Sequence, residues 1–148
     1  MNRPARSWRN APTAPRSSRV AELGEGFYPH QSQIEAYGNG GFRFAGMSHR
    51  GSLLCLPGGM HAWPVSTAAE VTLQTLQPVL DAAADIDVLL VGMGKDFAGF
   101  DPTVRAALRE RKIIVEAIAT GGAVRTYNVL LAEVRQVAAA LIAVENAR

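Results

Sequence analysis

The chain has 148 residues, 48% of them hydrophobic and 19% charged, a composition typical of one soluble globular domain. Its single cysteine, Cys55, excludes an internal disulfide framework and is typical of a reducing compartment. No apolar run approaches the roughly eighteen residues of a membrane-spanning helix, so no membrane span is expected.

The net charge of +2 conceals an uneven distribution. The first 19 residues carry five arginines and no acid, whereas the remainder carries ten bases and thirteen acids. We therefore expect a disordered or loosely packed basic tail over residues 1–30 and a single α/β domain over 31–148. A bacterial leader or a misassigned start is the favoured interpretation of the tail; a mitochondrial transit peptide and a nucleic-acid-binding arm are the alternatives. The favoured location is bacterial cytoplasm, with the mitochondrial matrix as the alternative, and nucleic acid is not an expected partner.

The N-terminal half of the domain is predicted to be a β-meander. Short strands are expected at residues 34–37, 42–44, 52–56 and 60–65. GNGG at 38–41 is typical of a hairpin turn, because asparagine and glycine tolerate positive φ. The alternation of Phe42, Arg43 and Phe44 predicts a half-buried strand.

The C-terminal half alternates helices and strands. We expect a helix with Thr75 as its N-cap, a buried strand at 88–91, and a helix capped by Asp101 with Pro102 at its first position. A second strand, covered on both faces, is expected at 113–118. Apolar residues at helical spacing through Ile142 predict one long closing helix. The order meander, then α-β-α-β-α, indicates a layered α/β domain around a mixed sheet.

A glycine turn, Gly92-Met93-Gly94, follows the first of these buried strands. It invites comparison with a dinucleotide-binding loop, but Phe97 stands where that fingerprint needs its third glycine, and the next helix begins only at Asp101. A structural turn is the favoured interpretation. The alternative is a ligand loop in which Lys95 and backbone N–H groups bind an anion.

The TGGAVRTYN segment is the second candidate site. Thr120 and Gly121 follow a strand and open a helix, at the edge of an α/β sheet where ligands bind and where the helix dipole favours an anion. Arg125 is interpreted first as the ion-pair partner of Glu116, with a ligand-binding or partner-contacting arginine as alternatives. The candidate ligand-binding residues are therefore Gly92, Met93, Gly94, Lys95, Thr120, Gly121, Arg125 and Asn128.

No pattern of residues indicates a catalytic or metal site. The three histidines, His30, His49 and His61, lack metal-ligand spacing, and Cys55 between leucines is expected to be a buried, inert thiol. No serine lies in a nucleophile elbow. We therefore expect no cofactor, no catalytic residue and no metal, and the balance of the sequence is against an enzyme.

Several segments together carry a family resemblance: SLLCLP, HAWPV, VLLVGMG, KIIVEAIAT, AVRTYNVLLAEVR and VAAALI. In these segments the chain, from Ile34 to its C-terminus, resembles the domain of unknown function 498/598 family. Members of that family include an assembly factor of mitochondrial respiratory complex I and an adipogenesis-associated protein. The resemblance implies a three-layer α/β fold around a central mixed sheet, and a role in protein binding or assembly. The family has no established reaction.

The chain departs from the family pattern at two places. Met93 replaces the threonine of a common Gly-Thr-Gly turn, and Val124 stands where a cysteine is common. The first change removes a hydroxyl from the expected pocket, and the second removes a thiol next to Arg125.

Three functional hypotheses follow. The favoured one is an interaction or assembly protein whose partner belongs to respiratory complex I, with an exposed apolar patch expected around Trp63, Phe97 and Phe100. The alternative is a small-anion or metabolite binder that uses the glycine turn and the TGGAVRTYN helix start. An enzyme of unknown class is third.

Overall fold

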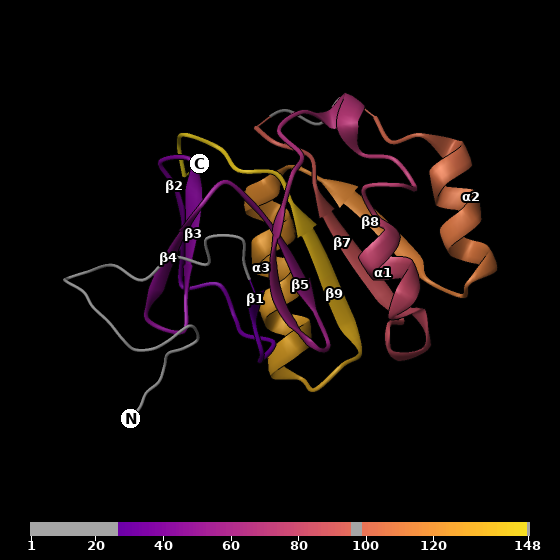
Figure 1. Ribbon diagram of the computed structural model, residues 1–148, viewed down its shortest axis with the longest axis horizontal. Helices are drawn as coiled ribbons and strands as arrows, with labels where there is room; N and C mark the ends of the chain where they lie inside the picture. The colour runs from indigo at the N-terminus through magenta and orange to yellow at the C-terminus, as the bar shows by residue number, and fades with distance from the viewer. Residues whose placement is uncertain (1–26, 96–98, 148) are drawn as a thin grey trace.

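The computed structural model describes residues 27–95 and 99–147, which form two sheets and three α-helices (Figure 1). The larger sheet has the order β1-β6-β5-β9-β7-β8. Its strands, in chain order, are β1 (Phe27–Tyr28), β5 (Ser52–Leu56), β6 (Gly59–Trp63), β7 (Val88–Gly92), β8 (Ile114–Ile118) and β9 (Val137–Leu141). β7 pairs in parallel with β8 and β9, whereas the other pairings are antiparallel, so the sheet is mixed as expected.

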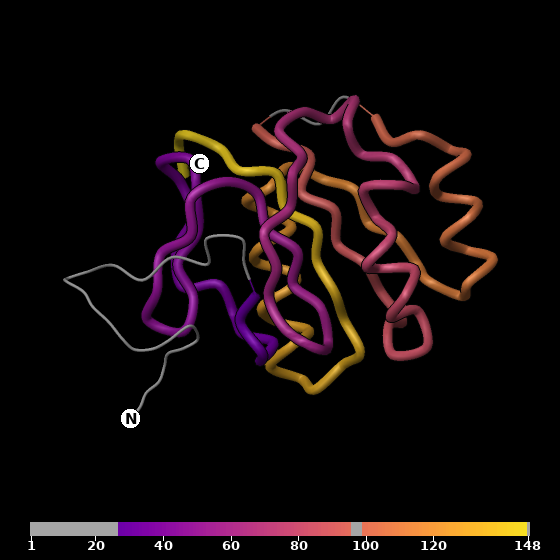
Figure 2. Tube along the Cα trace, viewed as in Figure 1, coloured from indigo at the N-terminus to yellow at the C-terminus, as the bar shows by residue number. Residues whose placement is uncertain are grey.

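A separate three-stranded antiparallel sheet comes from the N-terminal half. It consists of β2 (Ala36–Gly38), β3 (Gly41–Phe44) and β4 (Met47–Arg50). The C-terminal segment passes beside its first turn (Figure 2), where the N–H of Asn39 donates to the carbonyl of Glu145 at 2.7 Å. The strand expected at 34–37 is shifted to 36–38 in the structure. The strands β1 and β4 were not predicted from the sequence. The predicted tail lies largely in residues 1–26, outside the described part of the chain.

Alternating residues of the large sheet build a separate core on each face. On one face, Leu54 and Leu89 pack with α1 (Gln77–Asp81) and α2 (Pro102–Glu110). On the other, Leu53 and Leu90 pack with α3 (Thr120–Ala132) and with apolar residues of the three-stranded sheet, including Phe44. Because both faces are covered, the central strands are continuous apolar runs. The three-layer arrangement agrees with the expected fold class.

The helix α2 begins as the sequence indicates. The carboxylate of Asp101 accepts a hydrogen bond from the N–H of Thr103 at 2.8 Å, and Pro102 occupies the first helical position, where no donor is needed. Among the described residues no helix is long and apolar enough to cross a membrane.

The predicted long closing helix is wrong. The helix α3 ends at Ala132, and VAAAL forms β9 in the middle of the sheet, between β5 and β7. The N–H of Val134 donates to the carbonyl of Leu131, and that of Arg135 to the carbonyl of Leu130, as in a Schellman motif. Alanine favours helix in isolation, but a central strand needs small residues where two layers approach, and that tertiary demand prevails.

Two further expectations about the C-terminal half are corrected. Thr75 does not cap a helix: Leu76 is the N-cap of the five-residue α1, and the Thr75 hydroxyl instead donates to the carbonyl of Glu70 at 2.8 Å. β8 is an edge strand, not a strand covered on both faces, and Ile114 is 65% exposed.

The turn that ends α3 contains a strained residue. Val134 has φ of 59°, in the left-handed region that β-branched residues avoid, and its side chain is 89% exposed. Val134→Gly is therefore expected to raise the free energy of unfolding by about 1 kcal/mol, measured by chemical denaturation. Val129→Gly, inside the same helix with ordinary helical φ, should lower the stability; equal effects of the two substitutions would contradict the assignment of strain.

Candidate functional site

The buried hydroxyl of Thr120 joins the two predicted ligand loops. Its oxygen accepts from the N–H of Gly94 at 3.0 Å and donates to the carbonyl of Ile142 at 2.7 Å, while the Thr120 N–H donates to the Gly94 carbonyl at 2.9 Å. The side chain is fully buried. The ends of β7 and β9 and the start of α3 are thus joined through one side chain, whose hydroxyl both donates and accepts a hydrogen bond.

The glycine turn serves this junction. A Cβ atom at Gly92 would lie 3.0 Å from the Cα of Thr120, so only glycine permits this approach. Gly94 has φ of 99° and open space around it, and Lys95 beside it is exposed. Met93 is buried against the α1 and α2 core. The turn is structural at Gly92 and Met93, and only Gly94 and Lys95 remain accessible.

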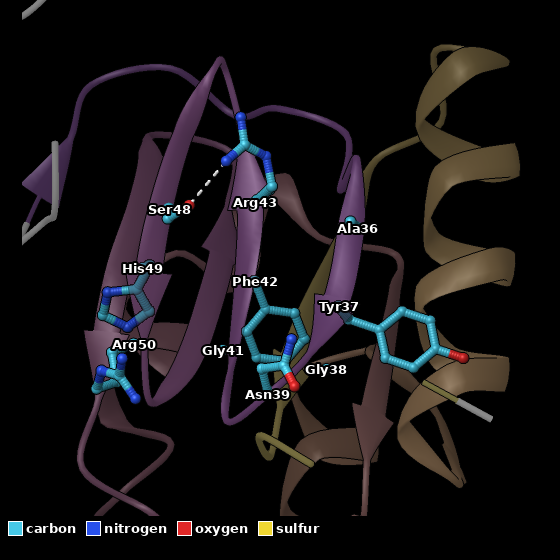
Figure 3. Close-up of a pocket in the computed structure, with 10 residues that line it drawn as sticks. All are labelled: Ala36, Tyr37, Gly38, Asn39, Gly41, Phe42, Arg43, Ser48, His49 and Arg50. Atoms are coloured by element: carbon cyan, nitrogen blue, oxygen red, sulfur yellow. Dashed lines mark hydrogen bonds between the residues drawn. The ribbon is translucent and has the colours of Figure 1, made fainter. Parts of the chain in front are cut away.

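The first turn of α3 is covered by the three-stranded sheet. The hydroxyl of Tyr37 lies over Gly121, where any Cβ would collide with it. Figure 3 shows the Tyr37 ring directed from β2 towards α3. The guanidinium of Arg125 lies near the same turn, with Nη1 3.6 Å from the Cβ position of Gly121 and Nη2 3.9 Å from that of Gly122. Gly121 is therefore needed for docking of the two layers.

The expected ion pair between Glu116 and Arg125 is not formed. Both side chains are exposed, and no ion pair joins them in the described part of the chain. The expectation assumed a carboxylate buried in a covered strand; because β8 lies at the sheet edge, water solvates Glu116 instead.

Asn128 holds the N-terminal segment on α3. Its amide oxygen accepts from the N–H of Ile34 at 2.8 Å, and its amide nitrogen donates to the Ile34 carbonyl at 2.9 Å. The adjacent Tyr127 hydroxyl donates to the carbonyl of Ser32 at 2.7 Å. Tyr127 and Asn128 therefore hold residues 32–34 against α3. The side-chain amide of Asn128 is not directed at the glycine turn or at the first turn of α3.

Cys55 is buried against Tyr127 in the core beneath α3. Burial raises the pKa of the Cys55 thiol far above its ordinary value, and a hydrogen bond with Tyr127 only partly opposes this. Burial likewise raises the pKa of Tyr127, with the neighbouring sulfur as a second cause. Such a thiol stays protonated, as the sequence analysis expected. Within residues 27–95 and 99–147, no cluster of three His, Cys, Asp or Glu residues is placed to hold a metal ion.

A hollow of about 390 Å³ lies on the three-stranded sheet (Figure 3). In the strand register Gly41 lies between Gly38 and Arg50, and all three residues line the hollow. Arg43 donates to the Ser48 hydroxyl at 2.9 Å across the same sheet. Two exposed arginines suit a carboxylate or phosphate. This hollow was not predicted from the sequence, because only the pairing of GFRF with MSHR brings its residues together.

Comparisons with known proteins match most of the chain. The family model described as "Protein of unknown function (DUF498/DUF598)" matches residues 34–142. An uncharacterised protein of Rhodobacter capsulatus is 36% identical over 77% of this chain and 86% of its own length. An assembly factor from Xenopus tropicalis, "NADH dehydrogenase [ubiquinone] 1 alpha subcomplex assembly factor 3", is 31% identical over 74% of this chain, and the match spans 60% of that protein.

The fold is also similar to a solved structure. A crystal structure described as an outer membrane protein from Bartonella henselae superposes with a TM-score of 0.77 and 46% sequence identity. The match covers 80% of this chain and 99% of that one.

The junction at Thr120 predicts a measurable loss of stability. Thr120→Val keeps the side-chain shape but leaves the N–H of Gly94 and the carbonyl of Ile142 without their partner. We expect the free energy of unfolding to fall by about 2–4 kcal/mol, measured by chemical denaturation. Thr126→Val, exposed on the same helix, should change it by less than about 0.5 kcal/mol. A small loss for Thr120→Val would mean that the junction is not a stabilising centre.

Proposed function

Because this chain belongs to the DUF498/DUF598 family, we propose that it is an interaction or assembly protein, with subunits of a respiratory NADH:quinone oxidoreductase as its partners. Relatives named as complex I assembly factors support the proposal. The observation that carries it is the exposed apolar side chain of Ile114 on the edge strand β8.

Ile114 begins the edge strand β8, whereas α3 packs mainly over β7 and β9. Gly122 lies against Ile118, since a Cβ there would be 3.2 Å from the Cδ1 of Ile118. Ile114, four residues before Ile118 and at the other end of β8, is 65% exposed.

The patch expected from the sequence lies elsewhere and is not supported. Trp63 is buried, and its indole N–H donates to the carbonyl of Thr75 at 2.8 Å. Phe100 is half-buried beneath the guanidinium of Arg105, which lies 5.3 Å from its ring centre. Phe97 lies outside the described residues. The exposed Ile114 on β8 takes the place of that patch in the proposal.

Affinity purification from the native cells tests this function. We expect the tagged protein to recover subunits of the NADH:quinone oxidoreductase, identified by mass spectrometry of the intact complex. Ile114→Glu should lose them, because it replaces the exposed apolar side chain of β8 with a charge. Phe27→Glu introduces the same charge on β1, at the opposite edge of the sheet, and should retain them. Recovery of the tagged protein alone, or equal recovery from both variants, would contradict the proposal.

The alternative function is binding of a small anion or metabolite, with the residues predicted from the sequence. Arg125 favours it, since its guanidinium lies beside the first turn of α3, where helix N–H groups and the dipole attract an anion. Thr120, Gly121 and Asn128 are engaged in internal contacts, so an anion would depend on Gly94, Lys95 and Arg125.

Titration with inorganic phosphate, followed by amide NMR, tests the alternative. Binding should shift the resonances of Gly94 and Gly122, and Arg125→Ala should abolish these shifts, because the guanidinium supplies the charge at that turn. Arg135→Ala removes an exposed charge beyond the other end of α3 and should leave them unchanged. Absence of saturable shifts at these glycines, or equal effects of both substitutions, would refute phosphate binding at this turn.

A further inference from the structure

β8 presents an unpaired backbone edge. It is the last strand of the large sheet and pairs only with β7. The N–H of Ile114 donates to the carbonyl of Asp87, before β7, so Val115 points its backbone groups the other way, outward. Ala117, two residues on, points outward as well. Among the described residues, the N–H of Val115 and both backbone groups of Ala117 have no hydrogen-bond partner.

A positively charged groove lies beside this edge. Its volume is about 180 Å³, and its lining comes from α2, the turn after it and the start of β8: Arg105, Arg109, Lys112, Ile113, Ile114 and Val115. These lining residues include three cations and no acid. Such a groove has the shape and charge to receive an extended acidic chain between a helix and a strand.

The cations of the groove are incompletely neutralised. Arg105 donates from Nη1 to the outward carbonyl of Val115 at 2.8 Å. Arg109 lies one helical turn further, on the same face of α2, where like charges repel. The side chains of Arg109 and Lys112 form no hydrogen bond or ion pair with any residue in the ranges 27–95 and 99–147. An acidic ligand would relieve this repulsion.

We propose that the groove between α2 and β8 binds an extended acidic segment of a protein partner, which joins the sheet as an additional strand. This inference rests on the proposed interaction function and names its docking surface. The outward groups of Val115 and Ala117 form the backbone hydrogen bonds, and Ile114 provides an apolar contact. Arg105 exchanges its contact with the Val115 carbonyl for a carboxylate of the segment, and Arg109 and Lys112 pair with further acids.

Charge selects this occupant over a second copy of the chain. A β8 strand from another copy would bring its own Arg105, Arg109 and Lys112 beside the same edge, and Glu116 is the only acid in that strand. An acidic segment complements the cations instead, and its binding should weaken as salt is added.

The probe is a short capped peptide of alternating glutamate and valine, titrated into the full chain and followed by amide NMR. Binding should shift the amides of Val115 and Ala117 and slow their hydrogen exchange. Arg109→Glu should weaken binding at least about tenfold. Arg111→Glu makes the same change two residues away, but Arg111 points towards the carbonyl of Leu80 on α1, so it should weaken binding only about twofold. A lysine–valine peptide of equal length should not bind.

A second variant tests the backbone contacts. Ala117→Pro removes only an outward N–H, which proline tolerates at a sheet edge, and should also abolish binding. If this variant does not fold, the comparison of Arg109→Glu with Arg111→Glu tests the inference by itself. Peptide binding with equal loss in both charge variants, or with shifts elsewhere, would overturn the inference.

Three outcomes decide between this inference, the proposed function and self-association. No peptide binding, while affinity purification still recovers oxidoreductase subunits, would refute the groove and leave the interaction role standing. A β8-dependent dimer of the free chain, detected by light scattering, would show that a second copy occupies the edge and would also refute the inference. Peptide binding without recovery of any such subunit would retain the groove and remove the proposed partner.

Discussion

The layered arrangement depends on the buried hydrogen bonds of Thr120. Its hydroxyl can bond both the turn after β7 and the chain after β9 only because Gly92 has no side chain in the way. A buried hydroxyl without partners would cost free energy, so the two strand ends and the helix start are stable only together. Once α3 lies there, Tyr37 and Asn128 place the three-stranded sheet and the preceding segment on it.

This constraint also determines which surfaces remain for recognition. In many open α/β sheets the carboxyl ends of the parallel strands hold a ligand. Here Thr120 and Met93 occupy much of that region with internal contacts, and Gly94, Lys95 and Arg125 remain accessible. The flank formed by α2 and β8 differs, because it combines unpaired backbone groups with unneutralised cations and the exposed side chain of Ile114. These are properties of a surface that binds another chain.

Local signals in the sequence were informative wherever one segment determined its own structure. The Asp101-Pro102 pair predicted the start of α2, and the alternation around Arg43 predicted a half-buried strand. The prediction of a helix through Ile142 was wrong, because the apolar spacing of alanines and valines is compatible with both a helix and a central strand. The prediction of an ion pair between Glu116 and Arg125 was wrong, because the composition of a strand does not show whether it lies at the edge or in the centre of a sheet.

The sequence by itself determined the fold class, most of the strands, the capped helix α2 and the family. Each of these depends on residues that are neighbours in the chain or on a pattern spread along it. Only the tertiary structure decided that β9 lies in the centre of the sheet, that β8 lies at its edge, and that Thr120 is a buried junction. The physical reason is that burial and hydrogen-bond satisfaction depend on strand order, and strand order arises from contacts between residues far apart in the chain.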